Sequence, residues 1–280
     1  MSSPVQRWPG DKPIAVVFNV CLEAWSEGKA PGINPMGNPL PPTVLDRMAI
    51  SWAEYGTRCG IQRLLRGLAR YGVRASVAVN GIVAEQFPAV VHAVADDGHE
   101  LVGHSYAMDV VPGLLSPEEE QANIDRCTKL IGEAAGAPVT GWLSPRATPS
   151  ADTPALLAAA DYQWHGDTLN DDLPYLQTVG ERDIVAIPFS TDVNDMPSMK
   201  YGAAPERMVE AFTENLAAAR QTGETALIDV TTHAHIFGRP RGAHFHEQVL
   251  EIATSAPDVW IATRAEIAAH VRQTSGTPVG

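Results

Sequence analysis

Long hydrophobic runs are missing from the 280-residue sequence, and so is any surplus of basic residues. A membrane-spanning helix needs about 20 consecutive apolar residues, so we expect no membrane partner. Lysine and arginine together number 20, against 33 aspartates and glutamates, which gives a formal net charge of -13. This acidic balance disfavours nucleic acids and anionic surfaces as partners.

Cysteine is also scarce. The three cysteines, Cys21, Cys59 and Cys127, are far apart and odd in number, which argues against a framework of disulfides. Residues 1–7 lack the charged-then-apolar pattern of a secretory signal peptide. Together these observations predict a reducing, cytoplasmic location.

Linkers and internal repeats are absent as well, so we expect residues 1–280 to form one catalytic domain. The single irregular stretch is a Pro- and Gly-rich arm at about residues 26–52, where prolines and glycines disfavour a helix or a central strand. A loop of this length is usually functional, for example as a lid or an interface arm. The arm is too irregular to bury its own apolar residues, which predicts a homo-oligomer, either a dimer or a tetramer.

The rest of the sequence alternates strand-like and helical segments. Residues 14–22 are typical of a buried strand and residues 184–189 of another strand. Residues 53–71 are typical of an amphipathic helix, residues 82–96 also look helical, and residues 116–119 (Ser-Pro-Glu-Glu) form a helix start. About seven such units in series indicate a parallel sheet, because parallel strands need helical crossovers. A barrel and a doubly wound sheet both fit, and in either the functional residues lie at the carboxyl ends of the strands.

Reactive side chains occur at these predicted strand ends. Cys21 and Glu23 end the first strand and share a face, and a buried acid is costly unless it is paired, catalytic or bound to a metal. His104 follows a Gly-flanked strand end, while His233 and His235 share a face at a later one, a spacing that suits a metal pair. Ordinary roles stay open for each, such as a rim salt bridge for Glu23 or a loop hydrogen bond for a histidine.

Residues 141–146, which end in Arg146, and the acidic stretch 167–175 lie between these strand ends. All these segments, in this order, resemble the NodB-type polysaccharide deacetylases, and more closely the branch of metal-independent allantoinases and cyclic imide hydrolases. The resemblance spans nearly the whole chain and implies an α/β fold, a deformed (β/α)7 barrel. The similar stretches are residues 52–58, 78–81, 98–106, 141–142, 170–175, 187–190, 194–195 and 238–240.

The departures from the family are informative. The wider family has two aspartates on its first strand, a base and a metal ligand, and here the matching residues are Cys21 and Glu23. The family's His-x-x-x-His metal motif is reduced to His104 followed by Met108, and a thioether is a poor ligand for a hard cation or for zinc. The allantoinase-like branch shows similar losses. His233 matches the family's catalytic histidine in the second half of the chain.

These features predict a hydrolase of non-peptide C–N bonds that opens the ring of a small cyclic amide, ureide or imide. We expect no metal cofactor, because an activated ring carbonyl is easier to attack than an acetamide. Cys21 is a nucleophile only if a histidine lowers its pKa, and an inert thiol is favoured. The expected catalytic residues are Glu23, His104, His233 and Arg146, and the expected substrate-binding residues are Cys21, Trp25, Trp142, Asp172 and Asn80.

Two alternatives stay open. The first is a divalent-metal-dependent N-deacetylase of an amino sugar or polysaccharide, in which Glu23, His104 and His235 bind zinc or another divalent cation. The second is a catalytically inactive binding protein that keeps the pocket. Cys21 in place of the family's base supports this second alternative, whereas the retained His104, Arg146 and His233 oppose it.

Overall fold

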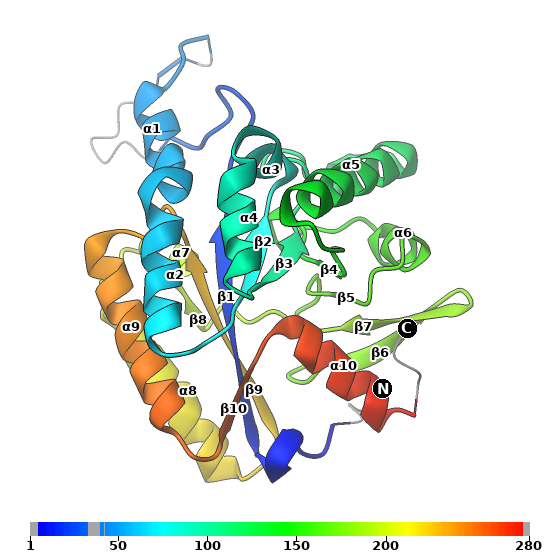
Figure 1. Ribbon diagram of the computed structural model, residues 1–280, viewed down its shortest axis with the longest axis vertical. Helices are drawn as coiled ribbons and strands as arrows, with labels where there is room; N and C mark the ends of the chain where they lie inside the picture. The colour runs from blue at the N-terminus through cyan, green and yellow to red at the C-terminus, as the bar shows by residue number, and fades with distance from the viewer. Residues whose placement is uncertain (1–4, 33–39, 42, 277–280) are drawn as a thin grey trace.

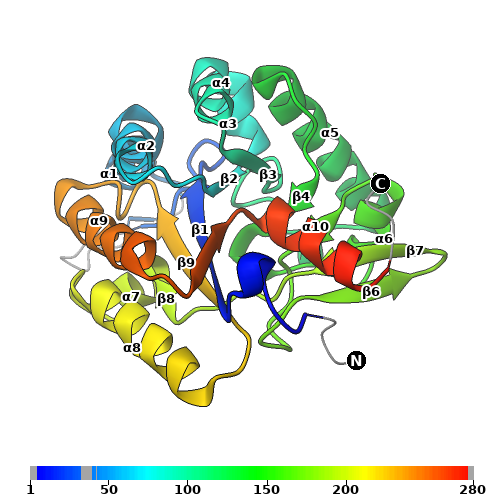
Figure 2. The ribbon, with the colours of Figure 1, turned by 60° about the horizontal axis from the view of Figure 1, so that its bottom comes forward.

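The structure is a computed structural model that describes residues 5–32, 40–41 and 43–276. Residues 33–39 and 42, in the middle of the arm, lie outside the described residues. A single curled sheet occupies the centre, with helices packed around its outside (Figures 1 and 2). Its strands run in the order β6-β7-β5-β4-β3-β2-β1-β9-β8, and β10 pairs with β1.

The bounds of the strands are β1 (Ile14–Leu22), β2 (Ser76–Val79), β3 (Glu100–Gly103), β4 (Gly141–Trp142), β5 (Trp164–His165), β6 (Tyr175–Val179), β7 (Arg182–Ala186), β8 (Val193–Asn194), β9 (Ala226–His233) and β10 (Val259–Ala262). The α-helices are α1 (Arg47–Tyr55), α2 (Ile61–Arg70), α3 (Gly81–Gln86), α4 (Pro88–Asp96), α5 (Pro117–Ala135), α6 (Thr153–Ala159), α7 (Asp195–Lys200), α8 (Arg207–Thr222), α9 (Pro240–Ser255) and α10 (Arg264–Thr274). Short helical turns are η1 (Pro9–Asp11), η2 (Gly56–Gly60), η3 (Pro112–Leu114) and η4 (Pro145–Ala147).

Strand β1 is the centre of the sheet and is buried along its whole length. On one side it pairs with β9, in a register that sets Cys21 beside His233. On the other side β10 pairs with its first half and β2 with its second half. All of these pairs are parallel, so the carboxyl ends of β1, β2 and β9 reach the same edge of the sheet.

Part of the arm is helical, which corrects the expectation of an irregular stretch up to residue 52. Helix α1 begins at Arg47, and the side chain of Asp46 caps it by accepting a hydrogen bond from the backbone N–H of Ala49 at 2.9 Å. The prolines that disfavour a helix all precede residue 43, so nothing prevents a helix after Asp46. The predicted helix over residues 53–71 is then interrupted by the π-helical turn η2.

Two other segments differ from the sequence prediction. The helix expected over residues 82–96 is split at Phe87, because Pro88 begins a new helix, α4. The strand expected over residues 184–189 is β7, which forms an antiparallel hairpin with β6. Gly180 makes this hairpin turn with a φ of +63°, so the sheet is not parallel throughout.

The helix start predicted at residues 116–119 is confirmed. Ser116 and Glu119 form a reciprocal capping box at the start of α5, and Gly136 ends the helix with a φ of +68°. Across the part of the chain that the structure describes, none of the helices combines the length and the apolarity that a membrane crossing needs.

Candidate active site

Five reactive side chains meet at the carboxyl edge of the sheet, and we call them the Glu23 cluster (Cys21, Glu23, His104, His233 and His235). Cys21 and Glu23 come from the end of β1, His104 follows β3, and the two other histidines come from the end of β9 and the turn after it. All five are buried. Residues predicted from three separate strand ends therefore lie within one group.

Glu23 is the centre of this cluster. Its Oε1 atom lies 3.6 Å from Nε2 of His104 and 3.4 Å from Nε2 of His233. Its Oε2 atom lies 3.9 Å from Nε2 of His235. Three imidazole rings thus present the same ring nitrogen to one carboxylate.

Asp195, which the sequence reasoning did not select, orients His233. Its Oδ1 atom lies 2.6 Å from Nδ1 of His233, and its Oδ2 atom accepts hydrogen bonds from the backbone N–H groups of His233 at 2.8 Å and Phe237 at 3.3 Å. A carboxylate only accepts hydrogen bonds, so Nδ1 of His233 carries the proton in this pair. The opposite nitrogen, Nε2, is therefore directed to Glu23.

His104 is oriented in the same manner by backbone. Its Nδ1 atom is hydrogen bonded to the carbonyl oxygen of Leu143, which can only accept, so this nitrogen donates and Nε2 faces Glu23. Asn80 holds the surrounding backbone, since its side chain donates to the carbonyl oxygen of His104 and accepts from the N–H of Ala24 at 2.9 Å. Asn80 thus connects the end of β1 with the His104 loop.

His235 is positioned by close backbone packing between the turn after β9 and the turn η2. A Cβ atom at Gly60 would lie 1.9 Å from the carbonyl oxygen of Ala234, and one at Gly238 would lie 2.0 Å from the same atom. Only glycine permits so close an approach at these two positions. The ring of His235 is then held between the edges of Trp52 and Trp25, at centroid distances of 4.4 and 5.4 Å.

The surroundings push the pKa values of Glu23 and His233 apart. Burial by itself raises the pKa of Glu23, but the charge of His233 and the nearby Nε2 atoms of His104 and His233 lower it well below its ordinary value. Burial by itself lowers the pKa of His233, but the charges of Asp195 and Glu23 and the hydrogen bond to Asp195 raise it well above its ordinary value. An ionised carboxylate and a protonated imidazole therefore lie side by side at neutral pH.

The other two members of the cluster are neutral. Burial raises the pKa of the Cys21 thiol, and the opposing effect of His233 is too small to offset it. Burial lowers the pKa of His235 to about 4. Cys21 is therefore a thiol and His235 an uncharged imidazole at neutral pH.

Several buried polar atoms of the cluster have no hydrogen-bond partner among the described residues. They are Oε2 of Glu23, Nε2 of His104, both ring nitrogens of His235, and Nε1 of the neighbouring Trp25. Buried polar groups in folded proteins are nearly always hydrogen bonded, so such a concentration of unpaired atoms indicates a place for a ligand or water.

A cavity of about 440 Å³ lies beside the cluster. Glu23 and Trp25 line it, together with residues from the segment 26–30, from α1 and η2, and from α3. This volume is in the range of small-molecule sites. Glu23 is only 3 % exposed, so a substrate can reach it only through an opening such as this one. Because Glu23 lines the cavity, the cavity offers a small substrate that route.

Four of the predicted site residues lie elsewhere or face away. Arg146 is exposed on η4, and no hydrogen bond or ion pair between described residues joins it to the Glu23 cluster. Asp172 is exposed and lines a separate cavity of about 500 Å³ beside α8. The ring of Trp142 is fully buried in the core and donates to Oγ of Ser144 at 3.0 Å. Asn80 is turned toward backbone, as described above.

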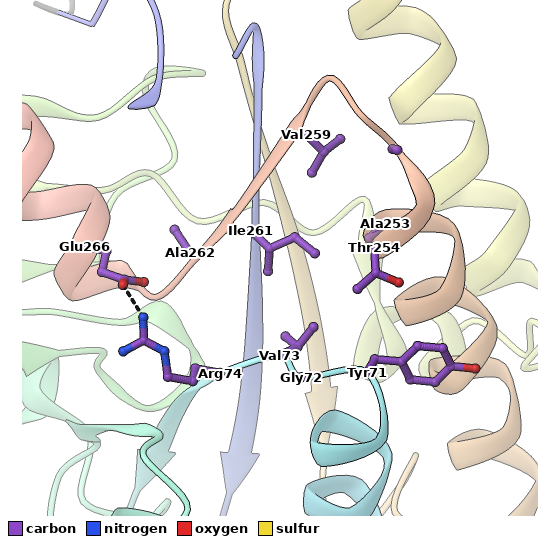
Figure 3. Close-up of a pocket in the computed structure, with 11 residues that line it drawn as sticks. Tyr71, Gly72, Val73, Arg74, Ala253, Thr254, Val259, Ile261, Ala262 and Glu266 are labelled. Atoms are coloured by element: carbon purple, nitrogen blue, oxygen red, sulfur yellow. Dashed lines mark hydrogen bonds and ion pairs between the residues drawn. The ribbon is translucent and has the colours of Figure 1, made fainter. Parts of the chain in front are cut away.

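A third cavity, of about 310 Å³, lies between the ends of α2 and α9 and strand β10 (Figure 3). The ion pair of Arg74 and Glu266 borders it. It adjoins the residues that precede β2, whereas the Glu23 cluster follows the ends of the strands. It brings together no group of acids, bases and nucleophiles comparable to that cluster.

Part of the Glu23 cluster has the geometry of a metal site. Cys21, Glu23 and His233 each offer one donor atom, and these three atoms lie within 4.8 Å of one another. Within the described part of the chain, no other group of three or more His, Cys, Asp or Glu residues meets this condition. The set predicted as the alternative metal site, Glu23 with His104 and His235, does not gather in this way. Met108, at the place of the family's second metal histidine, is buried in the core.

Known structures share this fold. A crystal structure from Mycobacterium smegmatis is 27 % identical, with a TM-score of 0.84 over 100 % of this chain and 96 % of that one. The structure of PuuE allantoinase is 22 % identical, with a TM-score of 0.87 over 99 % of this chain and 96 % of that one. The predicted fold class, the α/β barrel of NodB-type deacetylases, is thereby confirmed, in the form of a curled, mostly parallel sheet.

Comparisons of sequence agree with this fold. The polysaccharide deacetylase family model matches residues 46–165. A protein of Schizosaccharomyces pombe is 28 % identical over 93 % of this chain and 91 % of its own length. It and the Mycobacterium smegmatis protein are both named "putative polysaccharide deacetylase". The family model and these relatives show that the chain is similar to polysaccharide deacetylases.

Proposed function

We propose that this protein is a hydrolase of non-peptide C–N bonds and that it opens the ring of a small cyclic amide, ureide or imide. The observation that carries the proposal is the buried row Glu23, His233 and Asp195 beside a small cavity. Its two facing groups have pKa values shifted in opposite directions, which is how neighbouring residues divide the roles of general base and general acid.

The reaction needs one proton removed and one proton supplied. Glu23 accepts a proton from water, whose oxygen attacks the ring carbonyl carbon and forms a tetrahedral intermediate. His233 donates its Nε2 proton to the ring nitrogen as the C–N bond breaks. The proton on Glu23 then passes to His233 across the 3.4 Å between Oε1 and Nε2, which restores both groups.

Other residues of the site support these two. Asp195 fixes the ring of His233 and stabilises its charged form. His104, when its Nε2 carries a proton, donates to Glu23 or to the oxyanion that forms on the carbonyl oxygen. The unpaired Nε1–H of Trp25, which lines the cavity, is available to a substrate carbonyl. Cys21 is buried beside the acid and base and takes no proton-transfer role here.

Burial and size favour a small ring over a polymer. The catalytic groups are only 2 to 7 % exposed, and the neighbouring cavity has the volume of a small-molecule site. A polysaccharide needs an open groove along which several sugars bind. A strained or activated ring carbonyl is also a better electrophile than an acetamide, and this matches a site that works with side chains alone.

The wider family uses a divalent metal, which needs donors that converge on one point. Here Met108 replaces one of the family's histidines, and Glu23, His104 and His235 do not converge within 4.8 Å among the described residues. These residues do not fit the family's metal site, so we assign no catalytic step to a metal and propose no cofactor.

A second function, supported by the names of the relatives, is deacetylation of an amino sugar or polysaccharide. A panel of substrates separates it from ring opening. Purified enzyme is incubated, with and without EDTA, with succinimide-type imides, hydantoins and N-acetylglucosamine oligomers, and products are measured by chromatography. We expect turnover of a cyclic compound that survives EDTA. Turnover of the oligomers alone contradicts the proposal, and turnover of none favours an inactive binding protein.

We also propose that the protein forms a homo-oligomer through the arm. Large apolar side chains there are exposed, namely Leu40, Val44, Leu45 and Met48. Exposed apolar patches of this kind mark interaction sites. Light scattering at micromolar concentration is expected to give a multiple of the 30.0 kDa chain mass, and a 30.0 kDa particle contradicts this proposal.

A further inference from the structure

We propose that Cys21, Glu23 and His233 form a binding site for a thiophilic divalent cation such as Zn²⁺, and that the bound ion inhibits the enzyme. The inhibition, though not the binding, rests on the proposed function. The register of β1 and β9 sets Cys21 directly beside His233. The thiol sulfur, a carboxylate oxygen of Glu23 and a ring nitrogen of His233 all lie within 4.8 Å of one another.

The donor set decides which ion fits. One sulfur, one imidazole nitrogen and one carboxylate oxygen are ligands that zinc accepts, and three protein ligands leave a fourth position for water. A thiolate selects zinc or cadmium over magnesium or calcium, which prefer oxygen. On binding, the ion replaces two protons, the thiol proton of Cys21 and the Nε2 proton of His233, and both leave to solvent.

The site is already organised for such an ion. The Nδ1–H of His233 is held by Asp195 at 2.6 Å, which is the carboxylate–histidine arrangement that orients zinc ligands. Oε2 of Glu23 is buried without a hydrogen-bond partner in the described structure, so the carboxylate has a free acceptor. The cavity beside Glu23 gives an ion a path inward from the surface.

Occupation of this site stops both proton transfers. The ion takes the lone pairs of Glu23 that would accept a proton from water, and it takes the Nε2 position of His233 that would donate one. This site shares Glu23 with the family's metal site, but its other two ligands, Cys21 and His233, stand at the places of the family's base and catalytic histidine. The same cation that activates a metal-dependent deacetylase is therefore an inhibitor here.

The test uses two readouts on the full-length protein. Cd²⁺ is titrated while the ultraviolet thiolate-to-metal charge-transfer absorption is recorded, and Zn²⁺ is titrated against turnover of the best cyclic substrate. We expect one cadmium per chain and inhibition by zinc in the wild type. In Cys21→Ser the band is lost, and the inhibitory zinc concentration, measured against that variant's own metal-free rate, rises about a hundredfold.

Two further variants complete the test. Cys59→Ser removes an exposed thiol outside the cluster and is expected to retain both the band and the inhibition. Asp195→Asn keeps all three ligands but loses the anionic partner of His233, and we expect cadmium to bind about 10- to 100-fold more weakly.

A band that persists in Cys21→Ser, or no band in the wild type, overturns the site. Activation by zinc, or binding without inhibition, overturns the inhibitory role. If no substrate is turned over, the cadmium titration still reports the site.

Discussion

Strands β1 and β9 carry two buried polar groups that differ in how completely they are hydrogen bonded. The first is the Arg264 network (Asn19, Asp229, Thr231 and Arg264), which lies within the sheet. The second is the Glu23 cluster at its carboxyl edge. Both are almost inaccessible to solvent, and both contain carboxylates and cationic groups. Because β1 and β9 contribute to both groups and both are buried, burial alone does not explain the difference between them.

In the Arg264 network the charged atoms have partners. Arg264 pairs with Asp229, donates to Oδ1 of Asn19 at 2.8 Å and to the carbonyl oxygen of Ile187 at 3.3 Å. Asp229 also accepts from the amide of Asn19 and, at 3.0 Å, from the hydroxyl of Thr231. The Glu23 cluster instead leaves buried nitrogen and oxygen atoms unpaired. The comparison separates a network that stabilises the barrel from a cluster that is arranged for a substrate.

The largest effect on activity is expected at Glu23. In Glu23→Gln the side chain keeps its size but cannot accept the proton from water, so kcat/KM falls by about 10² to 10⁴. His233 keeps its bond to Asp195, and the fold is therefore retained. The measurement is steady-state turnover of the best cyclic substrate, together with circular dichroism. Activity close to that of the wild type would remove Glu23 from the mechanism.

The largest effect on stability is expected at Asp229. In Asp229→Ala the buried guanidinium of Arg264 loses its ionic partner, and we expect the free energy of unfolding to fall by about 3 to 5 kcal/mol. Urea unfolding measures this difference. His235→Ala in the unsatisfied cluster is the contrasting variant and is expected to cost less. Equal losses in the two variants would contradict the distinction between the two groups.

A third buried polar group, His246 on α9, belongs to neither the Arg264 network nor the Glu23 cluster. Its ring packs against Phe18, both ring nitrogens lack partners among the described residues, and burial lowers its pKa to about 4. The pKa of His246 in the folded protein lies below the ordinary 6.5, so the unfolded chain takes up the proton first as the pH falls. The free energy of unfolding therefore starts to fall below pH 6.5, and the loss is nearly complete at about pH 4. By pH 4 it reaches about 3 kcal/mol. His246→Leu is expected to lose less stability than wild type between pH 7 and 4, and an unchanged pH dependence would contradict this.

A smaller effect is expected at the glycine that supports His235. In Gly60→Ala the new methyl group meets the carbonyl oxygen of Ala234, and such overpacking costs about 1 to 3 kcal/mol. Gly132→Ala, within α5 and with its nearest contact at 3.5 Å, is the matched control and is expected to gain up to about 1 kcal/mol. Thermal unfolding of both variants measures the contrast. A Gly60→Ala protein as stable as wild type would show that the two turns can separate at no cost.

The strand-end rule explains how much of the site the sequence predicts. Glu23, His104 and His233 follow apolar segments that are recognisable as strands, and parallel strands must bring their carboxyl ends together. Asp195 was not selected, because β8 has only two residues and no apolar run marks it. Its signal in the sequence is the pair Asn194–Asp195, in which Asn194 caps α7.

The orientation of Trp142 and the turn at residues 56–60 could not be predicted from the sequence, for related reasons. Strand β4 has two residues, so the side of the sheet that Trp142 faces could not be read from alternation. The π-helical turn at residues 56–60 has the composition of an ordinary helix, and only the close packing against Ala234 reveals its purpose. Contacts between segments distant in the chain decide both the side of the sheet that Trp142 faces and the conformation of the turn at residues 56–60.

The protonation state of His233 tests the central assignment of acid and base most directly. Histidine labelled with ¹⁵N is titrated by NMR in the wild type and in Glu23→Gln. The account predicts that His233 is protonated at pH 7 in the wild type, because Asp195 and Glu23 raise its pKa, and that it loses its proton at a lower pH in Glu23→Gln. The neutral His235 serves as the internal reference, since its pKa is about 4. A neutral His233 at pH 7 in the wild type would contradict its role as the proton donor.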